Sequence, residues 1–572
     1  MMRLLWLGIL VLVLILPSSV LAGGYAPSAD ELLQKIEELS RELNNVRQQL
    51  QEVQSRQEDQ VEAVEDVTDK VEEMTTDGIS RFSAWGDYRF RLDYNRARHT
   101  KYWKSSTVLA AMRDFTGGDV KQLPALMRKM QMAPPNMASA MLQQAGYFPE
   151  SKGSQYNDTA YTNRLRLNVK VRPSENLVFK GRIAWYKLWG NVSDYTNTGN
   201  GMFPNNYFNN NMTQGVRPND GALYVDRAYV NWTNIGGLPM WFSVGRRPTT
   251  HSVPQQFREG LDKRDATPFG ANIDLPFDGA TIGYQYELFE NTGRIRFCYG
   301  RGFESGFKGD GAPKPKIDDT DFYGIAWDVI DNPDDDLLVI FQAFRAENLF
   351  DFPEGQMYLA NPEVPFGVYP AFTTATTNLG NIWELGGVVQ KKLFDVDCFA
   401  SVGMSITDPK RTSQGVIPGL GQAPWDDPFE GVGLLTDPGE KVSAKTGWSV
   451  YVGGRIPVEF LNSKFGIEYN YGSEYWLPFL IATDDLYMNK LSTRGHVAEA
   501  YWVWTLPETP ISRYANAFMR FGYQHYWFDY TGSGNWLGHP RDVDDLNNPM
   551  YAQAFTPVSD MDNFYLTFEV FF

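Results

Sequence analysis

The sequence predicts a transmembrane antiparallel β-barrel of about 16 strands, preceded by an α-helical coiled coil. The 572 residues include 36 Phe, 30 Tyr, 16 Trp and 51 Gly, and this composition favours pleated, turn-rich structure over helices. A heptad repeat precedes position 78, and an alternation of apolar and polar residues follows it. Beyond the N-terminus, no apolar stretch approaches the ~20 residues that a membrane-spanning helix needs. A helical membrane protein of several spans is therefore excluded.

Residues 1–22 have the features of a secretory signal peptide. Arg3 precedes an apolar run from Leu4 to Leu16, and small residues lead to Ala22, as at a cleavage site. The run is too short to span a bilayer comfortably, so we expect cleavage rather than a retained anchor. The mature chain should therefore begin near Gly23 in a bacterial periplasm.

Residues 23–78 are expected to form a periplasmic coiled-coil stalk. Its seam positions follow one another in steps of four and three, for longer than the three or four heptads that distinguish a coiled coil from a single amphipathic helix. Such a narrow stripe is buried only by sister chains, and its mixture of Ile, Leu and Val favours three strands over two. We expect a homo-oligomer, most simply a trimer, held by Leu32, Ile36, Leu39, Leu43, Val46, Leu50, Val53, Gln57, Gln60, Val64, Val67, Val71 and Met74.

Residues 79–572 are expected to form the barrel. Phe90 and Leu92 alternate with Arg89 and Arg91, and a period of two is typical of a strand with one apolar face. This alternation alone fits a membrane barrel and a soluble sandwich equally well. Strands are predicted near 82–94, 164–172, 177–183, 222–234, 239–247, 278–288, 293–301, 320–330, 336–347, 380–391, 395–406, 445–456, 463–474, 494–505, 515–528 and 562–572.

The connections between the predicted strands favour the membrane barrel. Short links such as 235–238 alternate strictly with long segments such as 248–277, which is the layout of outer-membrane barrels with short periplasmic turns. An even number of strands returns the chain end to the side of the stalk. The last strand keeps apolar residues at every second position and ends on Phe572, which resembles the membrane-insertion signal of Gram-negative outer-membrane proteins. We therefore expect a bacterial outer-membrane barrel with its stalk in the periplasm.

Two local segments and the overall organisation carry a resemblance to known porins. A signal peptide, a trimer-type coiled coil and a barrel that ends in Phe resemble the sugar and anion porins with periplasmic coiled-coil extensions. Residues Phe465–Trp476 and Val244–Thr249 are similar to segments of an uncharacterised proteobacterial family of predicted porins. The resemblance covers residues 79–572 and implies a Gram-negative outer-membrane porin, but that family has no established substrate to carry over.

Basic residues dominate the polar face of the first three predicted strands. Facing water, a ladder of cations would lower the energy of a passing anion and raise that of a cation. Asp87 and Asp93 share this face, so pairing of charges within the wall is the alternative. The candidate pore-lining residues are Arg89, Arg91, Arg164, Arg166, Lys170, Arg172, Lys180 and Arg182.

The third long connection, residues 248–277, is a candidate constriction loop. It carries charges of both signs within a short stretch, and opposed charges at a narrow point create a transverse field that orients dipolar solutes. A solvated surface loop is the alternative. The residues concerned are Arg258, Glu259, Asp262, Lys263, Arg264 and Asp265.

The first long connection, residues 95–159, is expected to contain short helices near 108–113, 122–132 and 137–144. It could act as a lid or a plug of the barrel. Cys298 and Cys398 fall on the seventh and eleventh predicted strands, too far apart for a disulfide, so free thiols are expected. No metal site, haem site or other cofactor is indicated, because neither Cys lies in a CxxC motif and no two His have the spacing of a zinc helix.

These features predict a passive diffusion channel for small hydrophilic solutes, with a preference for anions if the basic ladder faces water. The alternative is a structural or conduit protein of the outer membrane that docks a periplasmic or extracellular partner. A barrel enzyme is not expected, because no motif brings a nucleophile, a His and a carboxylate together. The formal net charge of −17 argues against a nucleic-acid partner.

Overall fold

The computed structural model describes residues 81–119, 122–190, 221–276, 278–288, 291–306, 317–332, 336–350, 355–361, 367–373, 378–410, 416–417, 421–422, 434–437, 440–480, 485–507, 516–553 and 556–572. The chain divides into two compact units, Met1–Ser80 and Arg81–Phe572. The predicted signal peptide and the stalk, with the seam from Leu32 to Met74, lie outside the described residues.

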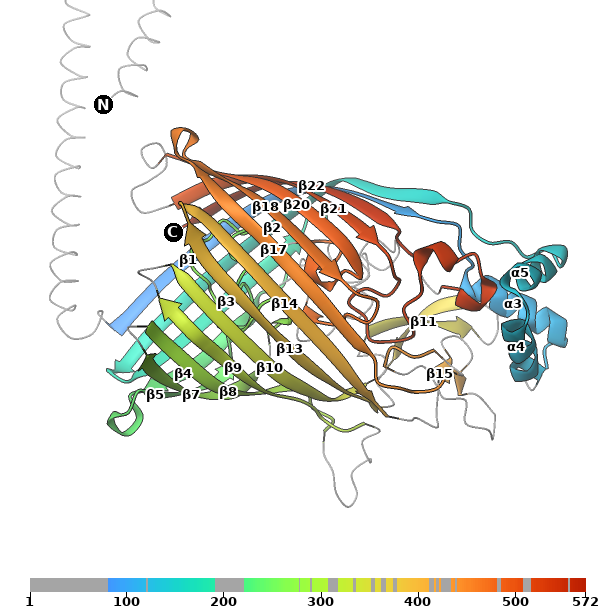
Figure 1. The fold of residues 1–572 in the computed structure, drawn as a ribbon, viewed down its shortest axis with the longest axis horizontal. Helices are drawn as coiled ribbons and strands as arrows, with labels where there is room; N and C mark the ends of the chain where they lie inside the picture. The colour runs from blue at the N-terminus through green and yellow to red at the C-terminus, as the bar shows by residue number, and fades with distance from the viewer. Residues whose placement is uncertain are drawn as a thin grey trace, which may run out of the picture. The chain divides into compact units, whose positions relative to one another are not determined.

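Sixteen antiparallel strands form one closed barrel (Figure 1). Closure is direct, because β1 pairs with β2 along one edge and with β22 along the other. The predicted antiparallel barrel of about 16 strands is confirmed. The barrel strands are β1 (Phe82–His99), β2 (Gly153–Ser174), β3 (Leu177–Leu188), β4 (Tyr224–Thr233), β5 (Met240–Arg246), β7 (Asp278–Leu288), β8 (Asn291–Phe303), β9 (Thr320–Asn332), β10 (Leu337–Phe350), β13 (Asn378–Leu393), β14 (Val396–Pro409), β17 (Thr446–Val458), β18 (Ser463–Gly472), β20 (Gly495–Thr505), β21 (Asn516–Phe528) and β22 (Asp560–Phe571).

The two faces of the barrel wall differ sharply in chemistry. Outward side chains are large, apolar and exposed: 57% of Phe297 and 57% of Ile467 are accessible. Their inward neighbours Arg296 and Glu468 are only 2% and 1% accessible. An apolar surface of this extent is unfavourable in water but favourable in contact with lipid. Closure of the barrel also leaves no strand edge with unpaired backbone groups.

The two rims of the barrel also differ. Neighbouring strands are joined by short turns at one rim, called here the short-turn rim, and by long segments at the other, called the long-segment rim (Figure 1). An even number of strands places the start of β1 and the end of β22 at the same short-turn rim. The chain end is held there, since Gly86 donates to Phe572 O at 2.7 Å and Phe572 donates to Gly86 O at 3.0 Å.

The first long connection is shorter than the sequence predicted. β1 continues to His99 and β2 begins at Gly153, so the connection covers 100–152 rather than 95–159. The strand extensions pair with each other, and the extension of β1 also pairs with β22, for example Asn95 with Asn563. They carry polar residues on both faces, so no alternation marks them in the sequence.

Three helices follow β1 close to their predicted positions, and Figure 1 shows them beyond the long-segment rim. They are α3 (Ser105–Thr116), α4 (Leu123–Met132) and α5 (Pro135–Gln144). α5 begins two residues before the predicted start, because Pro135 occupies its first turn, where the missing N–H costs nothing. No described helix is long and apolar enough to cross a membrane.

Small elements complete the structure. Cys298 on β8 and Cys398 on β14 are free thiols, which confirms the prediction. The remaining elements are η6 (Ile235–Gly237), β6 (Ile273–Asp274), β11 (Gly355–Asn361), β12 (Gly367–Thr373), β15 (Val416–Ile417), β16 (Gly421–Gln422), η7 (Glu459–Leu461), β19 (Phe479–Leu480), η8 (Lys490–Ser492), η9 (Val543–Asp545) and η10 (Pro549–Tyr551).

Candidate functional site

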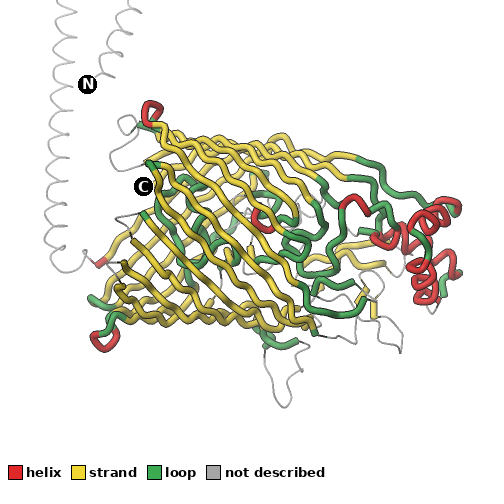
Figure 2. Tube along the Cα trace, in the orientation of Figure 1, coloured by secondary structure: helices red, strands yellow, loops and turns green. Residues whose placement is uncertain are grey.

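The candidate site is the interior of the barrel, where two connections fold inward. Figure 2 shows loop segments within the ring of strands. The first inner segment, residues 247–276, follows β5. Phe269 donates its N–H to Gln342 Oε1 on β10 at 3.0 Å, and Asn272 donates to Glu384 Oε2 on β13 at 2.8 Å. The constriction loop predicted from the sequence therefore lies against the inner wall.

The second inner segment, residues 473–480 and 485–494, was not predicted to enter the barrel. Its β19 pairs in parallel with β6 of the first inner segment. Trp476 is fully buried and donates Nε1–H to Leu491 O at 2.7 Å. The wall makes room at Gly447, where a Cβ would lie 2.2 Å from the backbone of Tyr475. The two segments support each other inside the lumen.

Asp265 of the first inner segment is bound by two arginines of the wall. Its Oδ2 lies 2.9 Å from Arg182 Nη1 on β3 and 2.6 Å from Arg227 Nη2 on β4. Arg182 also pairs with Asp226 at 2.7 Å. The carboxylate thus anchors the segment to one side of the barrel.

Asp262 and Arg264 anchor the same segment to other strands. Asp262 lies 2.5 Å from Arg455 on β17 and 2.6 Å from Lys464 on β18. Arg264 lies 2.9 Å from Asp328 on β9, which also pairs with Arg296 on β8. The side chain of Lys263 is exposed and makes no ion pair with any described residue. Charges of the predicted loop therefore reach widely separated parts of the wall.

Arg258 and Glu259 lie deeper in the structure. Arg258 pairs with Asp485 of the second inner segment and lies 3.4 Å from Glu499 on β20. Lys490 bridges Glu499, at 2.5 Å, and Glu468 of β18. All of these side chains are at most 2% accessible. Within the first segment, Glu259 Oε2 lies 2.6 Å from His251 Nδ1.

The predicted basic ladder divides into two groups. Five arginines are buried and face inward, and each has a partner: Arg91 with Asp93, Arg164 with Glu569, Arg166 with Asp87, Arg182 with Asp226 and Arg89 with Tyr186. The other three cations lie toward the short-turn rim and are partly or fully exposed. We call Lys170, Arg172 and Lys180 the rim cations.

None of the rim cations makes an ion pair with a described carboxylate; Asp265, whose charge acts on Lys180, is itself bound by Arg182 and Arg227. Lys170 stands directly opposite Lys180 in the register of β2 and β3, and like charges in this position repel each other. None of the three makes an ion pair or a hydrogen bond with another described residue. These three residues therefore leave unpaired positive charge on this side of the short-turn rim.

A charged cluster joins two long connections at the opposite rim. His539 Nδ1 lies 2.8 Å from Glu440 Oε2, and Arg541 Nη2 lies 2.7 Å from Glu440 Oε1. Burial would raise the pKa of Glu440, but the hydrogen bonds from His539 and Arg541 lower that pKa to about 2. The Glu440 carboxylate therefore stays ionised, and the cluster ties Asp437 and Glu440 to His539 and Arg541.

The sequence did not identify Asp485, Lys490, Glu499 or Asp328 as partners inside the lumen. These residues come from a long connection and from strands. Only the barrel closure brings Asp485, Glu499 and Asp328 to the first inner segment, and Lys490 to Glu499. No group of three or more described His, Cys, Asp and Glu side chains is arranged to hold a metal ion.

Comparisons with solved structures find outer-membrane barrels. The chain is similar to OmpT, an outer membrane protein of Vibrio cholerae in its trimer form (10% identity, TM-score 0.36), to an anion-selective porin from Comamonas acidovorans (9%, 0.38) and to OprB of Pseudomonas putida (9%, 0.36). Each alignment covers 86% of this chain, and 100%, 99% and 94% of the respective structure. At these identities the likeness concerns the fold alone.

Comparison of the sequence with known protein families finds a match to one family. No functionally curated protein matches the chain. A family described as a protein of unknown function, DUF3373, matches residues 154–572, which include fifteen of the sixteen barrel strands and both inner segments. The chain therefore belongs to the DUF3373 family of proteins of unknown function.

Proposed function

We propose that this protein is an outer-membrane channel that passes small hydrophilic solutes through a lumen narrowed by the two inner segments. The observation that carries the proposal is the contrast between an exposed apolar outer wall and an interior filled with ionisable and polar side chains. Stability alone does not require such an interior, since apolar residues often replace buried ion pairs without loss. A polar path through an apolar membrane does require it.

We further propose that the channel favours anions. The support is the entrance at the short-turn rim, where Lys170, Arg172 and Lys180 lack carboxylate partners among the described residues. A positive entrance raises the local concentration of anions and repels cations. The five buried arginines of the same ladder contribute little to this selectivity, because their partners offset their charge or hold them in place.

The assembly belongs to the same proposal. An even strand number brings both ends of the barrel domain to the short-turn rim, so we propose that this rim faces the periplasm and carries the stalk of residues 23–78. The heptad seam supports a trimer. Cleavage after residue 22 and insertion through the terminal Phe572 complete the proposed route to the outer membrane. No catalytic step is part of it.

Planar-bilayer recording of the purified protein tests the proposal. We expect small, steady single-channel currents, because the inner segments occupy much of the bore, and a reversal potential in a salt gradient that indicates anion preference. Chemical crosslinking in detergent should report trimers, and deletion of residues 23–78 should remove them. Silent bilayers would contradict the channel, whereas cation preference would contradict only the role of the rim cations.

A second candidate function is a structural or docking protein of the outer membrane. The observation that favours it is the dense interior, since inward residues such as Arg91, Asp328, Glu384 and Gln524 are 0% accessible. A barrel filled in this way would serve as a rigid anchor for a partner at either rim. Bilayers that remain silent even after the inner segments are loosened by mutation would support this function over the channel.

A further inference from the structure

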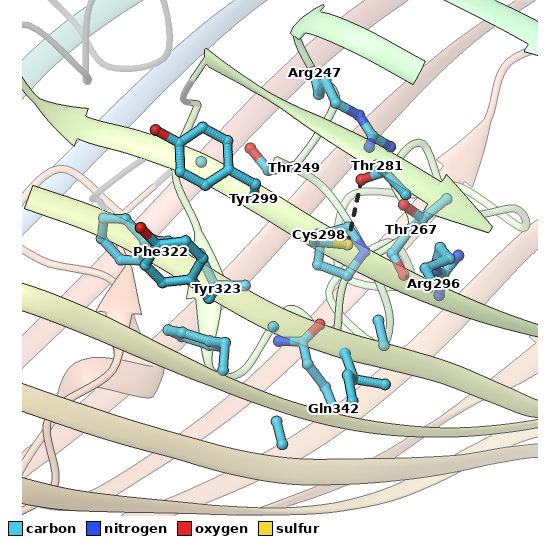
Figure 3. A pocket seen from close by; sticks show the side chains of 18 of the residues that line it. Arg247, Thr249, Thr267, Thr281, Arg296, Cys298, Tyr299, Phe322, Tyr323 and Gln342 are labelled. Carbon is cyan, nitrogen blue, oxygen red and sulfur yellow. Dashed lines mark hydrogen bonds between the residues drawn. The ribbon is translucent and has the colours of Figure 1, made fainter. Parts of the chain in front are cut away.

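We infer that the barrel holds a binding pocket for a small organic anion, in which Arg247 binds the carboxylate. The pocket lies between the first inner segment and the wall strands β7 to β10, and about 600 Å³ of it is free of protein atoms, part of this space being open to solvent. Figure 3 shows its side chains converging from the inner segment and the wall. The inference rests on the proposed channel and names a class of solute for it.

Arg247 is the feature that calls for an anionic ligand. It follows β5 directly and lines the pocket, and Figure 3 shows its guanidinium pointing toward Thr281 and Thr267. Its Nε is buried without a hydrogen-bond acceptor, and no described carboxylate pairs with the side chain. A largely buried cation without a partner is costly. A carboxylate that enters the pocket would remove this cost.

The other arginine of the pocket is already satisfied. Arg296 pairs with Asp328 and donates to Thr267 O at 3.3 Å. The hydroxyl of Thr281 donates to Cys298 Sγ at 3.3 Å, the contact drawn in Figure 3. Arg247 therefore provides the uncompensated positive charge of this pocket.

A second donor in the pocket is also unused. Gln342 on β10 accepts from the N–H of Phe269 through Oε1, but its Nε2 is buried without a partner. The lining between Arg247 and Gln342 includes Pro248, Pro268, Ile273, Phe322 and Phe344. An apolar pocket with a few directed polar groups selects a ligand of matching pattern. The ligand class is thus a carboxylate on an apolar body that carries a hydrogen-bond acceptor.

Equilibrium binding to the full-length protein in detergent tests the inference, with 4-hydroxybenzoate as the probe and titration calorimetry as the readout. We expect Arg247→Gln to weaken binding about tenfold or more, because an arginine–carboxylate pair is a charge-assisted bidentate contact. Arg246→Gln is the matched control. Arg246 is the preceding residue and its guanidinium lies 3.6 Å from Asp278, so its loss should change the affinity less than about twofold.

Further measurements separate a binding role of Arg247 from a structural one. Arg247→Gln should leave the thermal stability of the barrel unchanged or raised, because it removes a buried charge that has no partner; a lower melting temperature would overturn the inference. Gln342→Glu keeps the acceptor for Phe269 but replaces the free donor, so it should weaken 4-methoxybenzoate, whose ether oxygen can only accept a hydrogen bond, more than benzoate. Binding of 4-hydroxybenzyl alcohol as tight as that of 4-hydroxybenzoate would also overturn the inference, because no charge would then be recognised.

Bilayer currents distinguish failure of the pocket from failure of the channel. If binding depends on Arg247 but the protein conducts no ions, the binding pocket is supported and the proposed channel function is contradicted. Currents without binding of 4-hydroxybenzoate, or binding unaffected by Arg247→Gln, would overturn the pocket and leave the channel. Binding that depends on Arg247, together with block of the currents by the probe, would support both.

Discussion

The inward cations of β2 and β3 have different surroundings in the middle of these strands and near the short-turn rim. In the middle of β2 and β3, Arg166 and Arg182 are 5% and 3% accessible and bind Asp87 and Asp226. Toward the short-turn rim, Lys170 and Lys180 are half-buried and face each other without a carboxylate. A buried cation needs a partner, whereas water satisfies one at the rim. The paired residues therefore serve structure, and the unpaired ones remain available to solutes.

The largest effect on stability is expected at the most deeply buried ion pairs. Arg258→Met leaves the buried carboxylate of Asp485 without its arginine, which should lower the free energy of unfolding by about 3–5 kcal/mol. The loosened inner segments should also raise the single-channel conductance. Equilibrium unfolding in detergent measures the first effect and bilayer recording measures the second.

Arg264→Met is the matched control for Arg258→Met, because it removes an arginine from the same inner segment. Asp328 keeps Arg296 as a partner when Arg264 is lost. The free energy of unfolding should therefore fall by only about 1 kcal/mol. Equal losses in the two variants would show that burial and pairing do not distinguish these sites.

The next effect concerns the room that the wall leaves for the second inner segment. In Gly447→Ala, the added Cβ would meet the backbone of Tyr475 at 2.2 Å, and such overpacking should cost about 1–3 kcal/mol. Gly181→Ala is the control, because its Cβ would have no neighbour closer than 3.4 Å. Thermal unfolding of the Gly447→Ala and Gly181→Ala variants can be compared by monitoring the heat-dependent change in their gel migration. An undisturbed Gly447→Ala barrel would argue against the inward position of the second inner segment.

The sequence predicted the barrel strands well but predicted the strand ends at the long-segment rim and the inner segments less well. Alternation located all sixteen strands, and the predicted 278–288 coincides with β7, because lipid on one side and charge on the other leave a strict period of two. It failed at the ends of β1 and β2, where both faces are polar. The first inner segment was a candidate because it is the third long connection and carries opposed charges, with a solvated surface loop as the alternative. The second was not, because the inward position of Gly447 and Trp476 becomes meaningful only once strand register is known.

A smaller and local effect is expected where charges are paired but reached by water. The pKa of Glu440 is lowered from 4.5 to about 2, so its contribution is present above about pH 4.5 and is lost as the pH falls toward 2. The protection factors for amide hydrogen exchange at Asp437, Glu440 and residues 539–541 should therefore fall across this window. Glu440→Gln should show the fast exchange at neutral pH, whereas Glu304→Gln, at another ion pair of the same rim, should not.

The smallest effect on stability, and the most informative for function, is expected at the rim cations. Replacing both Lys170 and Lys180 by Gln removes two like charges that face each other, so the free energy of unfolding should stay within about 0.5 kcal/mol of its original value or rise. The reversal potential in a salt gradient should nevertheless move toward that of an unselective channel, because the positive entrance is lost. Lys391→Gln, an exposed cation on β13 near the same rim, provides the control and should leave the reversal potential unchanged. If both variants behave alike, the unpaired cations do not select solutes, and the contrast within β2 and β3 reflects solvation alone.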